Sequence, residues 1–279
     1  MLNFFLRKLI LLSLFFIVSC SSSLKDVSVT SLGKIQDLRT GEQLTPQAFV
    51  QKIATVPHIL LGEQHDNLAH HQAQFWLLQQ LQQYRPQGSV LLEMLSVDQQ
   101  PHIAKVEQNP TAYFNDLPSA LHWKKGWEWR FYGESVRYAL ENKTALVATN
   151  LTQQEVSTLM SGAEPIQGNQ STHPDIQKKI AQLILQHHHC DCDVQDPMIQ
   201  KMVQVQQFRD RRMAEKVLSA KTPNLLIAGN HHINRQIGVA VHLQDLSPQM
   251  PHTKVVTILM GSDSKGLSEK DADYIWILN

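Results

Sequence analysis

The sequence predicts an α/β fold, a single domain with a mostly parallel central sheet flanked by helices. Short continuous apolar runs alternate along the chain with longer segments of helical periodicity, which is typical of repeated strand-helix units. The apolar runs show no polar alternation, which indicates strands that are covered on both faces. At 279 residues and 42% hydrophobic content, the chain is long enough for one large domain with a well-filled core.

The order of the elements follows from apolar periodicity and from turn residues. A small hairpin is expected within 35–44, around Thr40-Gly41, and Pro46 suits the first turn of a helix that runs to Ala54. Asp66 or Asn67 can cap the helix that follows the first buried strand. Strands are then expected at 58–62, 89–93, 145–149, 224–228 and 254–260, and helices at 67–84, 97–107, 131–142, 152–160, 175–189, 197–220 and 236–243.

Some segments of this plan have features of their own. Gly162, Pro165, Gly168 and Pro174 punctuate residues 161–174, which predicts an exposed insertion between the two halves. The aromatic and aliphatic run at 274–278 predicts an edge strand. Along helix 197–220, apolar residues recur by threes and fours on one side. They include Met198, Met202 and Met213, and such methionines are more often core filler than contacts to a large apolar ligand.

The N-terminus predicts export and lipidation. Arg7 and Lys8 precede an apolar segment, residues 9–18, that has the layout of a secretory signal and is too short to span a bilayer comfortably. The residues up to Cys20 resemble a bacterial lipobox, and the alternative is an ordinary signal peptide with a chance cysteine. Because Ser21 follows and not aspartate, we expect lipidated Cys20 to anchor the chain at the outer membrane, on its periplasmic face. The predicted divisions are a signal peptide at 1–19, a lipidated cysteine and flexible tether at 20–34, and the α/β domain at 35–279.

The overall charge excludes one class of partner. Lys+Arg and Asp+Glu both number 25, so no net field attracts nucleic acid or an anionic membrane surface. Histidine, at 14, is in excess. Because imidazole titrates near neutrality and ligates metals and haem, this excess favours a ligand site without locating it.

Polar residues follow several of the predicted strands at the point where each strand ends. Glu63 and His65 follow the first buried strand, Glu93 ends the next, and His231 and His232 follow the strand at 224–228. Ligands bind beyond the carboxyl ends of parallel strands, so these groups should converge on one rim.

Each of these residues also has a plainer interpretation. His71 lies on the apolar side of its helix, where a lone histidine is usually a hydrogen-bonded core residue. Glu93 could serve only to stabilise a helix N-terminus. If the chain stays extended at His231-His232, the two rings diverge and only one of them faces the site.

Two further clusters could contact a ligand. The aromatic loop 122–132 could line a pocket for a planar ligand or form a satellite core, and its Tyr132, like Tyr113, could ligate ferric iron. The segment His187 to Cys192 is either a patch that captures a soft metal or haem, or a mobile polar loop with solvated histidines. A disulfide between Cys190 and Cys192 would be strained.

Taken together, these motifs resemble a known family. The residues that carry the resemblance are Gly62-Glu63-Gln64-His65-Asp66, Glu93-Met94, Trp123 with Trp127-Glu128-Trp129 and Tyr132, Gln207-Phe208-Arg209-Asp210 with Met213-Ala214, and Gly229-Asn230-His231-His232 with Gly238-Val239. In this order they are similar to the ChaN family of iron-regulated, haem-binding lipoproteins, within the broader superfamily of Tiki and TraB-like proteins. That superfamily has a Gly-x-x-His motif, which Gly62 to His65 matches, and some of its members are metal-dependent proteases.

The resemblance implies a haem-binding protein and not an enzyme. It implies haem held by tyrosine and histidine, a homodimer around paired haems, and a role in haem or iron uptake or storage at the outer membrane, with a haem-uptake receptor or transporter as a further partner. We expect Tyr132 and a rim histidine to ligate the iron, and Glu63 and Arg209 to contact propionates or the ligand histidine. The full set of expected haem-site residues is Tyr132, His65, His231, Glu63, His71, His232, Glu93, Trp127, Trp129 and Arg209.

The same rim supports a second hypothesis. In a metal-dependent hydrolase or protease of the Tiki/TraB-like type, His65, His231 and Glu93 would hold a divalent ion, and Glu63 would act as general base on its water. A purely structural lipoprotein fits less well, because buried clusters of histidine and glutamate are costly to keep without partners.

Overall fold

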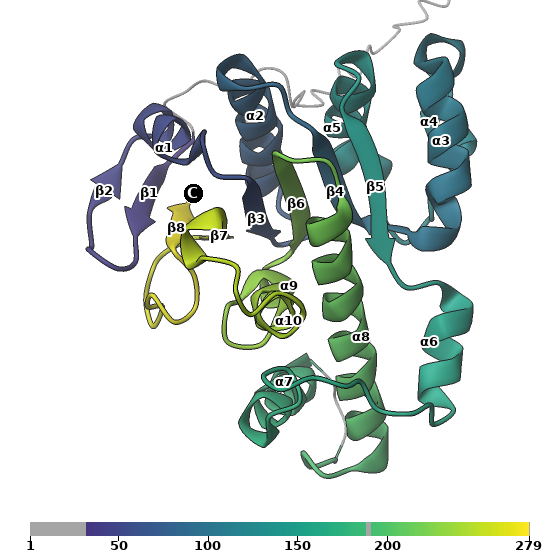
Figure 1. Cartoon of the computed structure of the whole chain (residues 1–279), viewed down its shortest axis with the longest axis vertical. Helices are drawn as coiled ribbons and strands as arrows, with labels where there is room; N and C mark the ends of the chain where they lie inside the picture. Colours follow the sequence, from purple (N-terminus) through teal and green to yellow (C-terminus); the bar gives the residue numbers. More distant parts are fainter. Residues whose placement is uncertain (1–31, 188–190, 279) are drawn as a thin grey trace, which may run out of the picture.

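One sheet of eight strands runs through the protein, and the computed structural model describes residues 32–187 and 191–278 (Figure 1). The strands are β1 (Lys34–Asp37), β2 (Gln43–Leu44), β3 (His58–Glu63), β4 (Ser89–Ser96), β5 (Ala145–Asn150), β6 (Asn224–Gly229), β7 (Val255–Gly261) and β8 (Tyr274–Ile277). Their order in the sheet is β2-β1-β8-β7-β3-β6-β4-β5. Strands β3 to β8 pair in parallel, and β1 and β2 add an antiparallel hairpin at one edge. The predicted α/β class with a mostly parallel sheet is confirmed.

Helices connect the strands and cover the sheet. They are α1 (Pro46–Ile53), α2 (Leu68–Tyr84), α3 (Gln100–Gln108), α4 (Leu117–Ala120), α5 (Trp129–Glu141), α6 (Gln153–Met160), α7 (Pro174–His187), α8 (Pro197–Ser219), α9 (Asn230–Ile233) and α10 (Val239–Leu246). Short 3-10 turns lie at Val97–Gln99, Pro110–Tyr113 and His252–Lys254. As expected from the sequence, Pro46 opens α1, and the Asn67 side chain caps α2 by accepting from Ala69 N at 3.0 Å.

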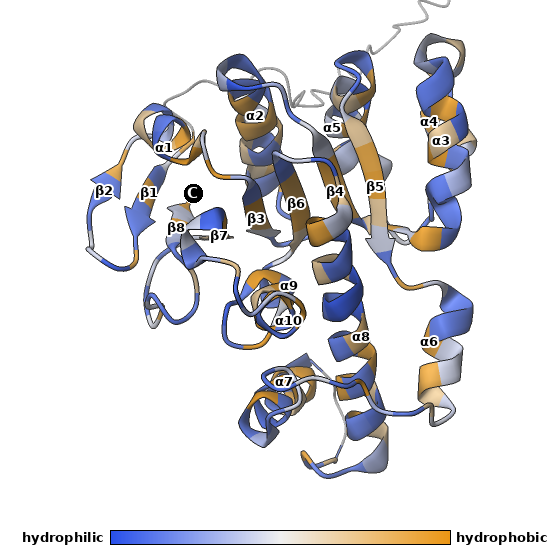
Figure 2. Ribbon diagram, in the orientation of Figure 1, coloured by the Kyte–Doolittle hydropathy of each residue, from blue (hydrophilic) through white to orange (hydrophobic). Residues whose placement is uncertain are grey.

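The central strands are buried on both faces, so the core has two main layers. Alternate residues of β3 point to opposite sides, with Ile59 and Leu61 in one layer and Leu60 in the other. Helices α1, α2, α3 and α5 cover the first face, while the second half of α8, α9 and α10 cover the second. Figure 2 shows the apolar colour along β3, β4, β5 and β6, as expected for strands with no solvent-facing side.

A third group of helices lies beyond the carboxyl ends of the parallel strands. Figure 1 shows α6, α7 and the first half of α8 below the tips of the central strands. Helices α7 and α8 share a small core of their own, which includes Ile180, Ile184 and Val203 and is separate from the two main layers. The space between this helical unit and the strand ends is where a ligand can enter.

The segment 161–173 is mostly exposed, as its glycines and prolines predicted. Ile166 and Ser171 are buried, and Asp245 of α10 accepts hydrogen bonds from the backbone nitrogens of Asn169, Gln170 and Ser171 at 3.0, 2.6 and 3.1 Å. Arg211 of α8 also contacts Asp245, at 3.2 Å. The prediction of an exposed segment is confirmed, and the structure adds a distant carboxylate that ties this segment to α10.

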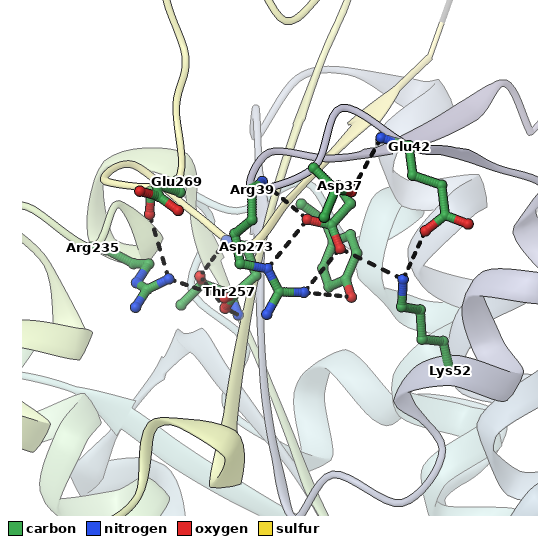
Figure 3. A network of polar contacts seen from close by, with 10 residues as sticks. Asp37, Arg39, Glu42, Lys52, Arg235, Thr257, Glu269 and Asp273 are labelled. Carbon is green, nitrogen blue, oxygen red and sulfur yellow. Dashed lines mark hydrogen bonds and ion pairs between the residues drawn. The ribbon is translucent and has the colours of Figure 1, made fainter.

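The prediction of an edge position for the C-terminal strand was wrong. β8 lies between β7 and β1, because the N-terminal hairpin pairs along its outer side. Figure 3 shows the polar contacts at this junction. Arg39 bridges Asp37 at 2.9 Å and the hydroxyl of Tyr274 at 3.1 Å, and Asp273 accepts from the Thr257 backbone and hydroxyl, both at 2.9 Å. Burial opposes ionisation of Asp37, but Arg39 outweighs it and lowers the pKa of that carboxyl to about 2.

Smaller differences concern the second half of the chain. Helix α5 begins at Trp129, within the predicted aromatic loop, and the helix expected at 236–243 is α10, preceded by the single turn α9. The methionines of α8 do not share one environment, because Met198 is 56% exposed while Met213 is fully buried. None of the described helices is both long and apolar enough to cross a bilayer. The predicted signal peptide, Cys20 and most of the tether lie outside the described residues.

The inner position of β8 generates a stability prediction. Trp276 is fully buried, packs edge-on against Phe49 and Trp76, and donates its indole N–H to the Leu32 carbonyl at 2.6 Å. Trp276→Ala should lower the free energy of unfolding by about 3–5 kcal/mol, measured by urea denaturation, because it leaves a large cavity. Tyr84→Ala, at a site that is 51% exposed, is the control and should cost roughly 0.5 kcal/mol or less. Equal costs for the two variants would contradict the inner placement.

Candidate functional site

A cavity of about 370 Å³ lies between the carboxyl ends of the strands and the α7–α8 unit. Its floor comes from the strand-end region and carries polar groups, while α7 and α8 supply both apolar side chains and the polar side chains of His187, Gln206, Arg209 and Asp210. The residues that line it are His65, Glu93, Trp127, Asn150, Ile180, Leu183, Ile184, His187, Met202, Gln206, Arg209, Asp210, Gly229, His231, His232 and Ile237. Of the site residues predicted from the sequence, the cavity therefore brings together His65, Glu93, Trp127, Arg209, His231 and His232.

Glu63 ends β3 just behind the cavity and is almost fully buried. Its carboxylate accepts from His65 Nδ1 at 2.7 Å and from the Tyr132 hydroxyl at 2.6 Å. The Gln74 amide also donates to it, and His71 Nδ1 lies 3.5 Å away. Burial raises the pKa of Glu63, but these donors outweigh burial and lower it, so the group is an ionised acceptor at neutral pH.

His65 connects Glu63 to the cavity, because it contacts the Glu63 carboxylate and also lines the cavity. Because Nδ1 is held by Glu63, Nε2 is the nitrogen available to a ligand. Nε2 lies close to Gly229, since a Cβ atom added to that glycine would be 3.0 Å from it. The His65 ring stands edge-on to the Trp127 ring, with 4.8 Å between the ring centroids. Burial lowers the pKa of His65, but Glu63 and Glu93 raise it by more.

A second buried cluster lies beside this pair. His232 Nδ1 lies 2.6 Å from Asp210 of α8, and its Nε2 lies 3.3 Å from Glu93 of β4. The other oxygen of Glu93 accepts from the Gly229 backbone N–H at 2.8 Å. Burial disfavours the imidazolium, but the two carboxylates outweigh it and raise the pKa of His232 to about 10. Burial raises the pKa of Glu93 as well, and His232 reverses this and lowers it to about 2.

The sequence did not single out Asp210 as a site residue. A signal was present, because Val203, Gln207, Asp210, Ala214 and Val217 advance by fours and threes along the buried side of α8. A carboxylate on such a face requires a partner, and a partner from α9 could not be inferred from spacing alone.

His231 and His232 differ because α9 turns the chain into a helix where an extended strand end was expected. In this turn the His232 ring is buried against the carboxylates, while His231 is exposed and lies 5.6 Å from the His187 ring of α7. Both rings line the cavity, because the segment does not stay extended, which was the condition for only one ring to face the site. Burial and the nearby histidines lower the pKa of His231, which favours its neutral, ligating form.

Tyr132, His71 and Trp129 do not line the cavity in this arrangement. The Tyr132 side chain is 2% exposed and donates to Glu63 from behind the cavity. Burial and the Glu63 carboxylate strongly raise the pKa of Tyr132, because a phenolate would place a second negative charge beside the first. Its role as an iron ligand stays a prediction.

His71 and Trp129 pack against residues of the core and not at the cavity. His71 is fully buried, stacks on Phe131 at 4.5 Å and places Nε2 3.0 Å from the His65 carbonyl, as the plainer interpretation of an inward histidine expected. Trp129 packs edge-on against Trp123 at 4.9 Å, against the main core. The aromatic loop is therefore mostly a satellite of the core, and Trp127 is its contribution to the cavity.

Among the described residues of the segment from His187 to Cys192, His187 belongs to the cavity lining. Residues 188–190 lie outside the described part of the chain. Cys192 is disulfide-bonded, so it does not offer a thiolate to a soft metal. Tyr113, the other candidate phenol, packs against the main core and not at the cavity.

The site does not favour the divalent-metal alternative. Within residues 32–187 and 191–278, no group of three or more His, Cys, Asp or Glu side chains is arranged to hold a metal ion. The physical reason is that Glu93 is occupied by His232 and the Gly229 amide, while Glu63 is occupied by His65, Tyr132 and Gln74. Both carboxylates therefore already accept hydrogen bonds or form ion pairs within the protein, which leaves them poorly placed to bind a metal ion.

Comparison with known proteins shows the family of this chain. Residues 49–243 match the family described as haem-binding uptake, Tiki superfamily, ChaN, and the chain therefore belongs to the ChaN family of the Tiki superfamily. Among solved structures, ChaN of Campylobacter jejuni, described with cofacial haem binding, has a TM-score of 0.81 and 28% sequence identity over 88% of this chain and 97% of that one. A comparison with curated proteins found no match.

Two further solved structures are much less similar. An erythromycin esterase mutant, EreC in its open conformation, has a TM-score of 0.45 and 14% identity over 82% of this chain and 78% of its own. A protein of Bacillus cereus has a TM-score of 0.46 and 10% identity over 77% and 70%. We draw no functional conclusion from either.

The buried His232 cluster predicts how stability depends on pH. A histidine with a folded-state pKa raised to about 10 contributes stability that is fully present below its ordinary pKa of 6.5 and is lost as pH rises towards 10. The free energy of unfolding, measured with urea between pH 7 and 10, should therefore fall with pH in the ligand-free protein. His232→Gln should be less stable at pH 7 and should show a shallower fall. The exposed His252→Gln variant should keep the wild-type slope, and equal slopes for all three proteins would rule out this role for His232.

Proposed function

We propose that this protein binds haem in the rim cavity and takes part in haem or iron uptake or storage as a lipid-anchored protein of the outer membrane. The observation that carries the proposal is the composition of the cavity, which combines apolar side chains of α7 and α8 with the imidazole rings of His65 and His231 near the strand ends and of His187 on α7. Membership of a haem-binding family supports it. The rest of the proposal concerns how this chain would hold the ligand.

The residues at the cavity fit a haem group. Haem requires an apolar slot for its flat ring and one or two strong axial donors. Ile180, Ile184 and Met202 provide apolar surface, and the rings of His65, His187 and His231 provide donors. The volume of about 370 Å³ is at the lower end of the roughly 300–1,000 Å³ typical of ligand pockets, so a porphyrin is enclosed only in part. Bound haem supplies iron that can be carried or stored.

His65 is the ligand we favour for the iron. Its Nδ1 hydrogen bond to the ionised Glu63 fixes the tautomer, orients the ring and increases the basicity of Nε2. The hydroxyl of Tyr132 and the amide of Gln74 hold Glu63 in turn, so the ligand ring is supported by a buried network. Tyr132, which the family resemblance implies as an iron ligand together with a histidine, would have to leave Glu63 before it could reach iron.

The partial enclosure of the porphyrin ring favours the association of two copies of the chain. A porphyrin larger than the cavity leaves one side uncovered, and a second copy of the chain with its own haem would cover that side. The cofacial haem binding described for the Campylobacter protein supports a homodimer around paired haems. Lipidated Cys20 would keep this dimer on the periplasmic face of the outer membrane, where a haem-uptake receptor or transporter would deliver or receive the haem.

Haem titration of the full-length chain, purified in detergent, tests the ligand assignment. His65→Ala should weaken haemin binding about tenfold or more and shift the absorption spectrum, because the axial donor is lost. His252→Ala, at an exposed position outside the cavity, is the matched control and should bind like the wild type. If wild-type protein shows no saturable spectral change with haemin, the haem proposal fails.

Tyr132→Phe separates the two candidate ligands. If His65 is the ligand, this variant keeps the spectral position of the wild-type complex, because Tyr132 acts only through Glu63. A variant spectrum that loses the wild-type iron bands, together with an unchanged His65→Ala complex, would assign the iron to Tyr132 instead.

The membrane anchor has its own test. Cys20→Ala in the full-length chain should prevent lipidation and move the protein from the membrane fraction to the soluble periplasmic fraction, measured by cell fractionation and fatty-acid labelling. Ser22→Ala, two residues further on, should leave both unchanged. A labelled, membrane-bound Cys20→Ala protein would contradict lipidation at this position.

A further inference from the structure

Two histidines at the cavity are not held by other side chains. His65, His71 and His232 each lie within 3.5 Å of a buried carboxylate. His187 and His231 differ from them, because in the described part of the chain neither ring has a hydrogen-bond or ion-pair partner. Both side chains are exposed and both line the cavity. Each neutral imidazole therefore keeps one nitrogen lone pair available for a ligand.

The two rings lie at a separation that suits one shared metal ion. His187 is the last residue of α7, and His231 belongs to α9, which follows β6. Their ring centroids are 5.6 Å apart, and the ring planes are tilted by 58°. With nitrogen–zinc bonds of about 2.0–2.1 Å, two imidazoles that share a tetrahedral ion place their centroids about 5 Å apart. Side-chain rotation alone can therefore bring one nitrogen of each ring to the same ion.

A second pair of histidines shows a geometry that does not suit an ion. His102 and His122 stack with their centroids 3.6 Å apart and their planes only 19° from parallel. The lone pairs of an imidazole lie in the plane of its ring, so two stacked rings cannot direct them to one point between the rings. The wider separation and the tilt of His187 and His231 leave room for an ion, and those of the stacked pair do not.

The surroundings indicate which ion fits. The carbonyls at the C-terminal end of α7 carry partial negative charge, which favours a cation beside His187. Imidazole suits zinc, copper and nickel, whereas magnesium and calcium prefer oxygen ligands. Glu93 and Asp210 are paired with His232, and Cys192 is disulfide-bonded. No third protein ligand is arranged within residues 32–187 and 191–278, so water would complete the coordination and the ion would be exchangeable.

We propose that His187 and His231 form a two-histidine site for a divalent zinc, copper or nickel ion, which ties the end of α7 to α9. The site is separate from that of the hydrolase alternative, because it uses neither Glu63 nor Glu93. It also does not depend on haem, since the favoured iron ligand is His65.

A bound ion would restrain α7. This helix packs on α8 through a small core of its own, and Lys179 of α7 lies 2.7 Å from the Gln236 side chain, in the segment after α9. The ion would add a second tie between α7 and that part of the chain. It would fix the helical wall of the cavity against the floor at the strand ends, where α9 begins.

Zinc and copper are the probes that test the pair, with the full-length chain purified in detergent without a histidine tag. Wild-type protein should bind Zn²⁺ saturably in calorimetric titration, and electron paramagnetic resonance of bound Cu²⁺ should show coupling to two imidazole nitrogens. His231→Ala should weaken both ions about tenfold or more, because loss of even a supporting partner of a metal ligand costs about ten- to a hundredfold. The copper spectrum of this variant should lose one nitrogen.

His187→Ala is a second variant with the same expected loss, and His173→Ala is the matched control. His173 is an exposed ring 3.6 Å from Asp175 and does not line the cavity, so its variant should bind both ions as the wild type does. Thermal unfolding of the metal-free His187→Ala and His231→Ala proteins should match the wild type, because both side chains are exposed. This measurement separates loss of the site from loss of the fold.

The neighbouring histidines at 188 and 189 offer an alternative site for the same ions. A double variant, His188→Ala with His189→Ala, should keep the wild-type affinity and the two-nitrogen copper spectrum. If His231→Ala binds zinc and copper as the wild type does, the proposal is wrong, whatever the double variant shows. The absence of saturable binding to the wild-type chain would also overturn it. Neither result bears on haem binding, because no haem enters the measurement.

Hydrogen exchange tests the tie between the two helices. Zn²⁺ should slow amide exchange at the C-terminal end of α7 in the wild type, because an ion held from both sides restrains that end. The same addition should have no effect on α7 in His231→Ala, where one side is missing. Equal protection of α7 by zinc in both proteins would show that His187 binds the ion without His231 and would contradict the shared site.

Discussion

The structure of the site depends on the need to satisfy two buried carboxylates, Glu63 at the end of β3 and Glu93 within β4, on the two strands that flank β6. An ionised carboxylate without partners is among the most costly groups to bury, so each must collect donors from elsewhere in the fold. Glu63 takes them from the α2 and α5 side, through Gln74 and Tyr132, and from His65. Glu93 takes them from the Gly229 amide and His232. The two sets together hold β3, β4, α5 and α9 in the relative positions that form the cavity floor.

The opposite wall of the cavity is held together by apolar packing. Helices α7 and α8 pack on each other through a small apolar core, and the cavity lies between that core and the polar floor. The ties to the main body include Asp245, which holds the preceding segment, and α8 itself, whose second half packs on the sheet. A ligand with one apolar face and one coordinating centre matches these two walls, and haem has both.

Much of this protein was predictable from local sequence. Buried strands without alternation, the Asn67 cap and the glycines after apolar runs predicted the parallel sheet and its helices, and the strand-end motifs predicted both the family and the rim. The predictions failed where a residue's partner lies far away in the chain. The β8 strand is internal because β1 pairs with it, more than 230 residues away in sequence, as the Arg39 to Tyr274 contact illustrates. Asp210 was missed because its partner His232 lies on a turn that was expected to be extended.

The sequence by itself thus determined the elements, the family and the set of polar residues that meet at the strand ends. Only the tertiary structure decided which of those residues line the cavity. Tyr132 and His71 contact Glu63 behind the cavity, while His65, His231 and Arg209 line it. The reason is that a strand-end motif fixes the backbone position of a side chain. Contacts from α2, α5 and α8, which are distant in sequence, determine which side chains pair with the buried charged groups.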